Sequence, residues 1–179
     1  MNKLTIEHLA PYVPYGLKVL VEEYGIELVV GIHGNDIITT EDNAHFSAVK
    51  PILRPLSYLT KEIEHNGEKF VPLVELFKLS RDNYQQEIKY HCVMATSQIQ
   101  IEMLGFRNYF FGLYESDRDV RIENGLYFDC YSTDLVMDNR IEEKILCQYS
   151  LFQKLFEWHF DVFQLIPQNL AVDINTIKT

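Results

Sequence analysis

The sequence has only three cysteines, Cys92, Cys130 and Cys147, and no two of them are close together in the chain. An odd number of widely spaced cysteines does not fit a disulfide framework, and it is typical of reduced thiols inside a cell. The first 25 residues hold acidic, histidine and proline residues where a signal peptide needs an apolar stretch. We therefore expect a cytoplasmic protein.

Long apolar runs and basic clusters are also missing. The longest apolar run in the N-terminal half, 28–32, is far below the ~20 residues that span a bilayer. The net charge of −10 is spread evenly, with −3, −3 and −4 on residues 1–60, 61–124 and 125–179. Nucleic acids and anionic membranes both attract clustered positive charge. We expect neither as a direct partner.

The common motifs of enzymes and metal sites are missing as well. There is no C-x-x-C, H-E-x-x-H, H-x-H or EF-hand spacing, and the six histidines are scattered over the chain. Phosphate-binding glycine loops and the G-x-S-x-G nucleophile motif do not occur either. We expect no metal and no cofactor, and we lean against an enzyme without excluding one.

If a catalytic site exists, its acids and histidines must meet only in the folded chain. The candidates are His33, His91, Glu157, His159 and Asp161. In a helix, His159 and Asp161 lie about 200° apart and cannot form a pair, whereas Glu157 and Asp161 share a face. Two solvated acids are the ordinary interpretation of that face. His91 and Cys92 are neighbours in a predicted strand and would face opposite sides.

The first third of the chain has the pattern of antiparallel strands. Segments rich in Val, Leu and Ile at 17–24, 26–32 and 37–40 are separated by Gly25 and by the turn sequence His-Gly-Asn-Asp. Residues 48–56 contain two prolines, which lack an amide donor, and predict an edge strand or an extended crossing segment. We expect a small β-meander over 15–56.

Asn66-Gly67 is the strongest local turn signal. Such a pair favours a type I′ hairpin, which would place Ile63 opposite Phe70 and His65 opposite Glu68. A short helix over 57–64, ending at the same pair, is the alternative. Residues 72–80 predict a short helix with proline in its first turn.

The middle of the chain predicts a second set of strands. Apolar residues alternate over 88–94 and 99–103, and aromatic runs occupy 109–114 and 126–131. Aromatic runs can form base-stacking platforms, but those lie in basic grooves, and residues 106–131 carry a local charge of −2. We interpret these aromatic side chains as core.

The last forty residues predict one long helix. Aromatic and aliphatic residues recur there every three or four positions, Asn139 and Glu142 resemble a capping box, and Pro167 would end the helix near Leu165. Residues 168–179 form an apolar tail that could add a strand.

The expected fold class is α+β, with a small N-terminal antiparallel β-meander, further strands in the middle and one long buried C-terminal helix over 140–165. We expect a single compact domain, 1–179, with subdomains 1–65 and 66–179 if it divides.

Three phrases resemble a known group. These are HLAPYVPYGLK at 8–18, VKPILRPLS at 49–57, and LFEWHFDVF at 155–163 with LAVDIN at 170–175. They are similar to uncharacterised prophage-type proteins of gut Bacteroidetes, a group without an assigned activity. The resemblance covers both ends of the chain better than residues 80–140. It implies a phage or prophage accessory protein and gives no functional residue.

The sequence therefore favours a non-catalytic phage accessory protein that acts through protein–protein interaction. Its partner would be an unknown protein or a second copy of the chain. The alternatives are a hydrolase-type enzyme whose site assembles only in three dimensions, and an acidic phage regulator or nucleic-acid mimic.

Overall fold

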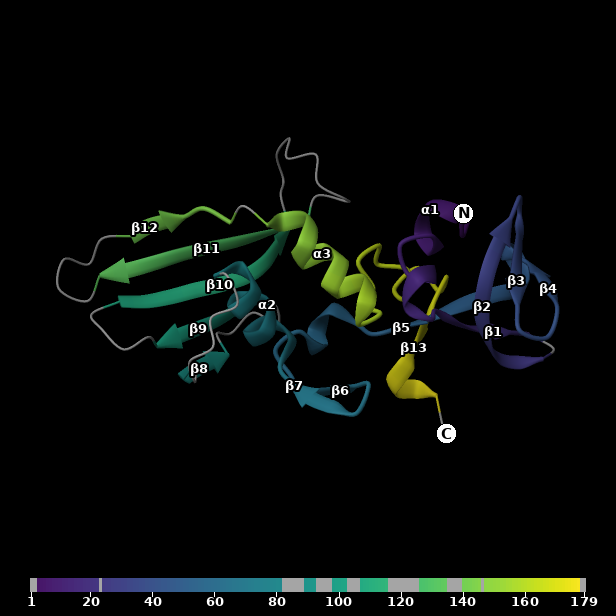
Figure 1. Cartoon of the computed structure of the whole chain (residues 1–179), viewed down its shortest axis with the longest axis horizontal. Coiled ribbons are helices and arrows are strands. Elements are labelled where there is room, and N and C mark those ends of the chain that lie inside the picture. Colours follow the sequence, from purple (N-terminus) through teal and green to yellow (C-terminus); the bar gives the residue numbers. More distant parts are fainter. Residues whose placement is uncertain are drawn as a thin grey trace. The chain divides into compact units, whose positions relative to one another are not determined.

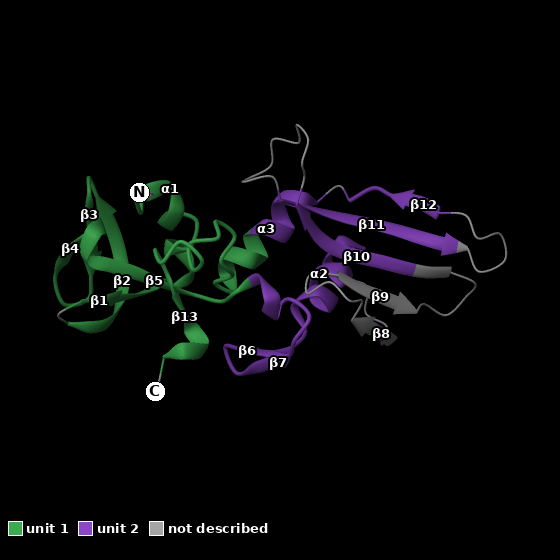
Figure 2. Ribbon diagram, turned by 180° about the vertical axis from the view of Figure 1, so that it is seen from behind, with its two compact units in different colours: residues 1–55, 153–179 green, residues 56–152 purple. Residues whose placement is uncertain are grey.

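The computed structural model describes residues 3–22, 24–81, 89–92, 98–102, 107–115, 126–134, 140–145 and 147–177. The chain divides into two compact units (Figure 2). Unit 1 consists of residues 1–55 and 153–179, and unit 2 of residues 56–152. Residues from both ends of the sequence therefore build one unit.

Unit 1 is organised around a six-stranded sheet (Figure 1). Its strands are β1 (Lys18–Val21), β2 (Gly25–His33), β3 (Asp36–Thr39), β4 (Asn43–His45), β5 (Val49–Leu53) and β13 (Val172–Asp173). They lie in the order β13-β5-β1-β2-β3-β4. All neighbours are antiparallel except β13, which pairs in parallel with β5. The helix α1 (Ile6–Leu9) precedes the sheet.

The strands of the expected N-terminal meander are present, but the expectation for its last segment was wrong. β5 is not an edge strand, because it lies between β1 and β13. Its Pro51 is opposite Val19 of β1. The β13 side of β5 is paired only at Ile52 and Leu53, so Pro51 needs no partner there. The apolar C-terminal tail supplies that short strand.

One face of the unit 1 sheet forms the core of this unit. Val19, Val21, Val29 and Ile37 alternate with exposed neighbours on β1, β2 and β3, and all four are buried. Glu27 lies on the same buried face, and its carboxylate accepts a hydrogen bond from the Thr39 hydroxyl on β3. The bond satisfies a group that would be costly to bury alone.

Unit 2 contains a five-stranded antiparallel sheet in the order β12-β11-β10-β9-β8. Its strands are β8 (Lys89–Cys92), β9 (Gln98–Glu102), β10 (Arg107–Glu115), β11 (Leu126–Asp134) and β12 (Arg140–Glu143). The long central pair, β10 and β11, is matched over nine residue pairs, from Arg107–Asp134 to Glu115–Leu126. This is the second set of strands that the alternating and aromatic segments predicted.

The Asn66-Gly67 hairpin is confirmed with its predicted register. Strands β6 (Ile63–His65) and β7 (Glu68–Phe70) pair Ile63 with Phe70 and His65 with Glu68. Asn66 and Gly67 have φ values of 52° and 82°, the left-handed conformation that a type I′ turn requires at both positions. The helix predicted for residues 72–80 is also present, as α2 (Pro72–Ser80).

Aromatic side chains join α2 to the sheet of unit 2. Phe77 of α2 packs edge-on against Phe111 of β10, with ring centroids 5.6 Å apart. Phe111 in turn stacks on Phe128 of β11 at 5.7 Å. All three are buried, so this part of the aromatic runs is core, as we expected. Phe106 lies outside the described residues.

The long C-terminal helix was a wrong prediction. Residues 140–143 form strand β12, in which Glu142 pairs with Tyr131 and caps no helix. The helix α3 occupies only Gln148–Glu157, and its 10 residues make it the longest of three helices in the described part of the chain. The proposed cap residue, Asn139, lies outside that part.

A left-handed residue ends α3 well before Pro167. His159 has φ 57°, its amide donates to the Phe156 carbonyl, and the Phe160 amide reaches back to the Leu155 carbonyl at 2.8 Å. These two bonds are those of a Schellman motif. Leu155 and Phe160, both fully buried, supply the apolar pair that accompanies it. The apolar spacing continues beyond His159, but in turns.

We predict that Gly25→Ala destabilises the protein by about 1 kcal/mol, because Gly25 has φ 90° and alanine is strained in that conformation. Gly31→Ala, in the same strand, is the matched control. A Cβ there meets only ordinary contacts, the nearest 3.7 Å away on Ile38. Urea unfolding of both variants measures the difference. Equal stability of the two would contradict the assignment of strain to Gly25.

Candidate functional site

Three of the five candidate residues of the sequence lie at the C-terminal end of α3 or just after it, and the other two lie on strands. His33 ends β2 on the exposed side of the unit 1 sheet. Glu157 ends α3 and forms an ion pair with Lys154 at 2.7 Å. His159 and Asp161 lie in the turn that follows α3. His91 lies on β8 of unit 2, and its side chain is outside the described residues.

Asp161 is a structural carboxylate rather than a solvated acid. Its side chain is 3% exposed, and its two oxygens accept hydrogen bonds from the Leu165 and Ile166 amides, each at 2.8 Å. Both carboxylate oxygens therefore accept hydrogen bonds from the backbone of the turn after α3. This arrangement fixes the backbone after α3, and it leaves Asp161 little freedom to act on a ligand.

Burial raises the pKa of Asp161 above its ordinary value, because a buried carboxylate loses its hydration. The hydrogen bonds from Ile166 and Leu165 and the nearby His8 oppose this shift without reversing it. The folded protein therefore binds the Asp161 proton more tightly than the unfolded chain does. Stability associated with this group is largest at low pH and is lost as pH rises through the raised pKa.

Tyr12 ties the same turn to the N-terminal segment. Its hydroxyl donates to the Phe160 carbonyl at 2.7 Å and accepts from the Val162 amide at 3.2 Å. Its ring packs edge-on against Phe156 with centroids 5.0 Å apart. Tyr12 is fully buried, and the two backbone groups that it bonds are also joined to each other, since the Val162 amide donates to the Phe160 carbonyl at 2.9 Å.

Unit 2 contains a second polar cluster, around Cys130. Arg81 donates to the Cys130 sulfur at 3.4 Å and contacts the Glu143 carboxylate at 3.4 Å. The Ser132 hydroxyl donates to the other oxygen of Glu143 at 3.2 Å. Burial raises the pKa of the Cys130 thiol, although Arg81 acts in the opposite direction. A buried, protonated thiol is a poor nucleophile, so we assign this cluster to structure.

On the opposite side of the unit 2 sheet, two aromatic pairs cross β10 and β11. Phe110 stacks on Tyr131 with centroids 4.7 Å apart, and Tyr114 lies 5.9 Å from Tyr127. The Arg140 guanidinium lies over Tyr131 at 4.1 Å and within 3.9 Å of the Asp129 carboxylate. These aromatic residues are half-buried rather than core, so the core interpretation of the two runs applies to one face only.

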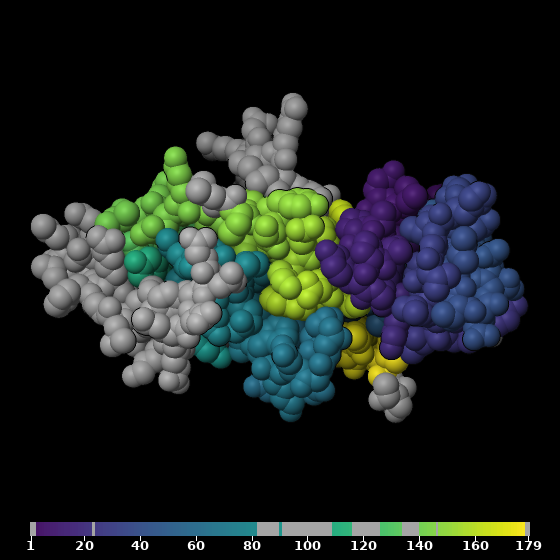
Figure 3. Space-filling view, in the orientation of Figure 1, coloured from purple at the N-terminus to yellow at the C-terminus, as the bar shows by residue number. Residues whose placement is uncertain are grey.

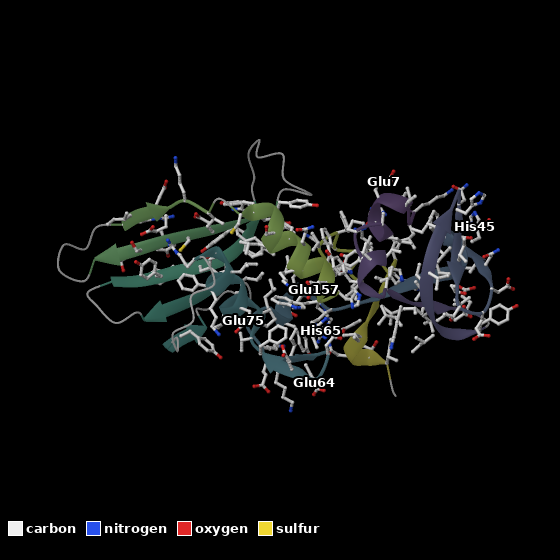
Figure 4. All side chains as sticks on the ribbon, in the orientation of Figure 1. Glu7, His45, Glu64, His65, Glu75 and Glu157 are labelled. Atoms are coloured by element: carbon white, nitrogen blue, oxygen red, sulfur yellow. The ribbon has the colours of Figure 1, made fainter. Side chains whose placement is uncertain are left out.

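Metal binding finds no support in these arrangements. Across the residues that the structure describes, no three histidine, cysteine or acidic side chains are placed to hold a metal ion. His33 and His45 lie opposite Asp36 on either side, but the His45 ring bonds the Ser47 hydroxyl at 2.8 Å. Figure 4 labels His45 on the unit 1 sheet. The described helices are likewise too short or too polar to cross a membrane.

The outward side of the unit 1 sheet is apolar, which the sequence analysis did not predict. Large aliphatic side chains lie exposed there on three neighbouring strands. We call this set the outer apolar face: Leu20 of β1, Ile26, Leu28 and Val30 of β2, and Ile38 of β3. The strands that carry it are the blue end of the space-filling view (Figure 3). Tyr24, 65% exposed, lies in the turn between β1 and β2.

Local backbone geometry brings these side chains together. Leu20 is directly opposite Ile26 in the β1–β2 register, so their side chains share a face. A bulge interrupts the β2–β3 pairing between Val29 and Gly31, and the extra residue is Val30. Val30 points outward and is 56% exposed. Ile38 lies beside Gly31, which has no side chain to cover it.

The signal for this surface was present in the sequence. Residues 26–32 are apolar at almost every position, as in a strand that is covered on both faces. Among the residues that the structure describes, only one face of β2 is covered. Contiguous exposed apolar surface on a folded unit commonly marks an interaction site. The outer apolar face is therefore the candidate functional surface.

Comparisons with known proteins identify no relative. No family model, no curated protein and no solved structure matches this chain.

We predict that Tyr12→Phe lowers the free energy of unfolding by about 2 kcal/mol, since it removes two buried hydrogen bonds, those of the hydroxyl with the Phe160 carbonyl and the Val162 amide. Tyr24→Phe removes the same hydroxyl from an exposed side chain and should change stability by less than about 0.5 kcal/mol. Chemical denaturation of the two variants gives the comparison. A loss in Tyr24→Phe as large as that in Tyr12→Phe would show that burial is not the cause.

We also predict a pH signature of Asp161. Relative to Asp161→Asn, which cannot ionise, the wild type should lose stability as pH rises above about 4, the ordinary pKa of an aspartate. Unfolding free energies of both proteins measured from pH 4 to pH 7 test this. A wild-type advantage that grows with pH would mean that the amide hydrogen bonds dominate and that the pKa is lowered.

Proposed function

We propose that this chain is a non-catalytic interaction protein that docks on a protein through the outer apolar face. The observation that carries the proposal is the exposure of Leu20, Ile26, Leu28, Val30 and Ile38 together on one side of a regular sheet. Burying such a surface gains roughly 25 cal/mol for each Å² removed from water. An accessory role in a phage or prophage rests on the sequence resemblance alone.

The placement of the polar residues supports this proposal over a hydrolase. The carboxylate of Asp161 holds backbone amides, Glu157 is paired with Lys154, and His33 is exposed at a strand end. Each of these side chains has a structural or surface explanation. These three side chains therefore favour no second function.

The proposal can be tested by capturing partners from a Bacteroidetes lysate on the tagged full-length chain. Val30→Lys places a charge in the centre of the outer apolar face and should reduce recovery of specific partners at least about tenfold, because an unpaired buried ammonium costs several kcal/mol. Ile6→Lys changes an exposed aliphatic residue of α1, 43% exposed, and is the matched control.

Circular dichroism and thermal unfolding confirm that both variants fold. Recovery of the same partners by wild type and Val30→Lys would contradict a role for the outer apolar face. Equal losses in Val30→Lys and Ile6→Lys would also contradict it, because they would indicate a general effect of added charge.

A further inference from the structure

Charges of opposite sign flank the outer apolar face. Lys18 of β1 is exposed and directly opposite Leu28. Asp36 of β3 is exposed and two residues before Ile38, on the same side of the strand. Val30 lies between them on the middle strand, so a basic and an acidic side chain stand on opposite sides of an apolar centre.

We propose that the outer apolar face binds the same face of a second copy of this chain. The two copies would be related by a two-fold axis that lies in the interface and passes near Val30. Lys18 of each copy then meets Asp36 of the other, Leu28 meets Ile38, and Val30 meets its own equivalent. This inference rests on the proposed function, since it names the partner of the same surface.

The registers of the strands make these contacts compatible with one axis. Asp36 lies two strands from Lys18 and about five residues further along, or roughly 10 Å by 16 Å at standard strand spacings. Ile38 lies one strand from Leu28 and about three residues further along, or roughly 5 Å by 10 Å. The line from Lys18 to Asp36 and the line from Leu28 to Ile38 run in nearly the same direction across the sheet. The midpoint of each line falls beside Val30. A single two-fold axis therefore exchanges both pairs.

Charge favours a second copy as the occupant. In a two-fold interface a surface must be complementary to itself, so a rim of a single sign would repel its own copy. Here Lys18 and Asp36 balance each other although the whole chain carries −10. Lys50 and Glu22 lie near Leu20, away from this centre, and Lys50 already bonds Asn169 at 2.9 Å. His33 and His45 flank Asp36 on the adjacent strands.

The bulge in β2 gives the interface its centre. An extra residue in one strand changes the direction of a side chain, and here that residue is the apolar Val30. Val30 can pack against its equivalent in the second copy through strand β2 alone. The exposed position of Val30 and the charges on both sides of it belong to one surface, which the pairing would cover.

The test is sedimentation equilibrium of the full-length chain over a range of concentrations. We expect the wild type to form a dimer in equilibrium with monomer. Lys18→Glu places a second carboxylate against Asp36, and Asp36→Lys places a second ammonium against Lys18, so each variant should dissociate at least about tenfold more readily. Lys3→Glu, an equal charge change at an exposed residue of the same unit, should leave the dimer unchanged.

Mixing the two charge variants is the decisive measurement. In an equimolar mixture, the carboxylate introduced by Lys18→Glu on one chain meets the ammonium introduced by Asp36→Lys on the other. The remaining native pair, Asp36 of the first chain and Lys18 of the second, is also of opposite sign. Two variants that are each monomeric should therefore form a heterodimer. Circular dichroism of each variant alone confirms that it folds, so restoration by mixing cannot come from repair of the fold.

Three results would overturn the inference: a wild type that is monomeric at all concentrations, a dimer that neither charge variant weakens, or a mixture that stays monomeric. The proposed function has a separate readout. If the wild type is monomeric while Val30→Lys still loses captured partners, the surface binds a different protein and only the pairing of copies fails. If Val30→Lys changes neither the recovery of partners from the lysate nor the dimerisation seen in sedimentation equilibrium, both proposals fail.

Discussion

Unit 1 depends on a short main-chain ladder between Arg54 and the turn after α3. The Arg54 amide donates to the His159 carbonyl at 2.7 Å, and the Asp161 amide donates to the Arg54 carbonyl at 2.8 Å. This bridge joins the end of β5 to residues more than one hundred positions later in the chain. Tyr12 and the carboxylate of Asp161 then hold the turn in the conformation that the bridge needs. These bonds, together with the pairing of β13 with β5, make the C-terminal segment part of the N-terminal unit.

The same arrangement explains why the polar residues look functional in the sequence and structural in the fold. Asp161 satisfies backbone amides that a regular helix would have satisfied itself. In unit 2, Arg81 and Glu143 pair with each other and bond the buried side chains of Cys130 and Ser132. Buried polar groups must be hydrogen-bonded, and a side chain whose hydrogen bonds are made within the fold is not free to act on a ligand. Within the described part of the chain, a group of aliphatic side chains faces solvent on the outer side of β1, β2 and β3.

Local signals in the sequence predicted local structure well. Asn66-Gly67 determined a hairpin and its register because the turn and both strands lie within eight residues. The prediction of a long C-terminal helix was wrong because the spacing of apolar residues indicates which side chains are buried. Buried side chains continue after the helix ends. His159, Gln164 and Asn169 all adopt left-handed conformations there, and none of them is a glycine that would have marked a stop. The apolar tail predicted that a strand could form there, but no local pattern identified β5 as the partner of β13. The outer apolar face was missed because an apolar run does not show which of its sides the chain will cover.

The composition of unit 1 from two separate segments has a consequence for synthesis. β5 can form as soon as its residues leave the ribosome, but β13 and the turn that bridges Arg54 come only after the whole of unit 2 has been made. At about 5–20 residues per second, that interval is on the order of ten seconds. During this time the nascent sheet lacks the strand that covers the edge of β5, and the turn that Tyr12 holds does not yet exist. Until the C-terminal segment is synthesised, the incomplete unit 1 is exposed to chaperones, proteases and neighbouring nascent chains. The folding yield should therefore depend on how fast translation proceeds through unit 2.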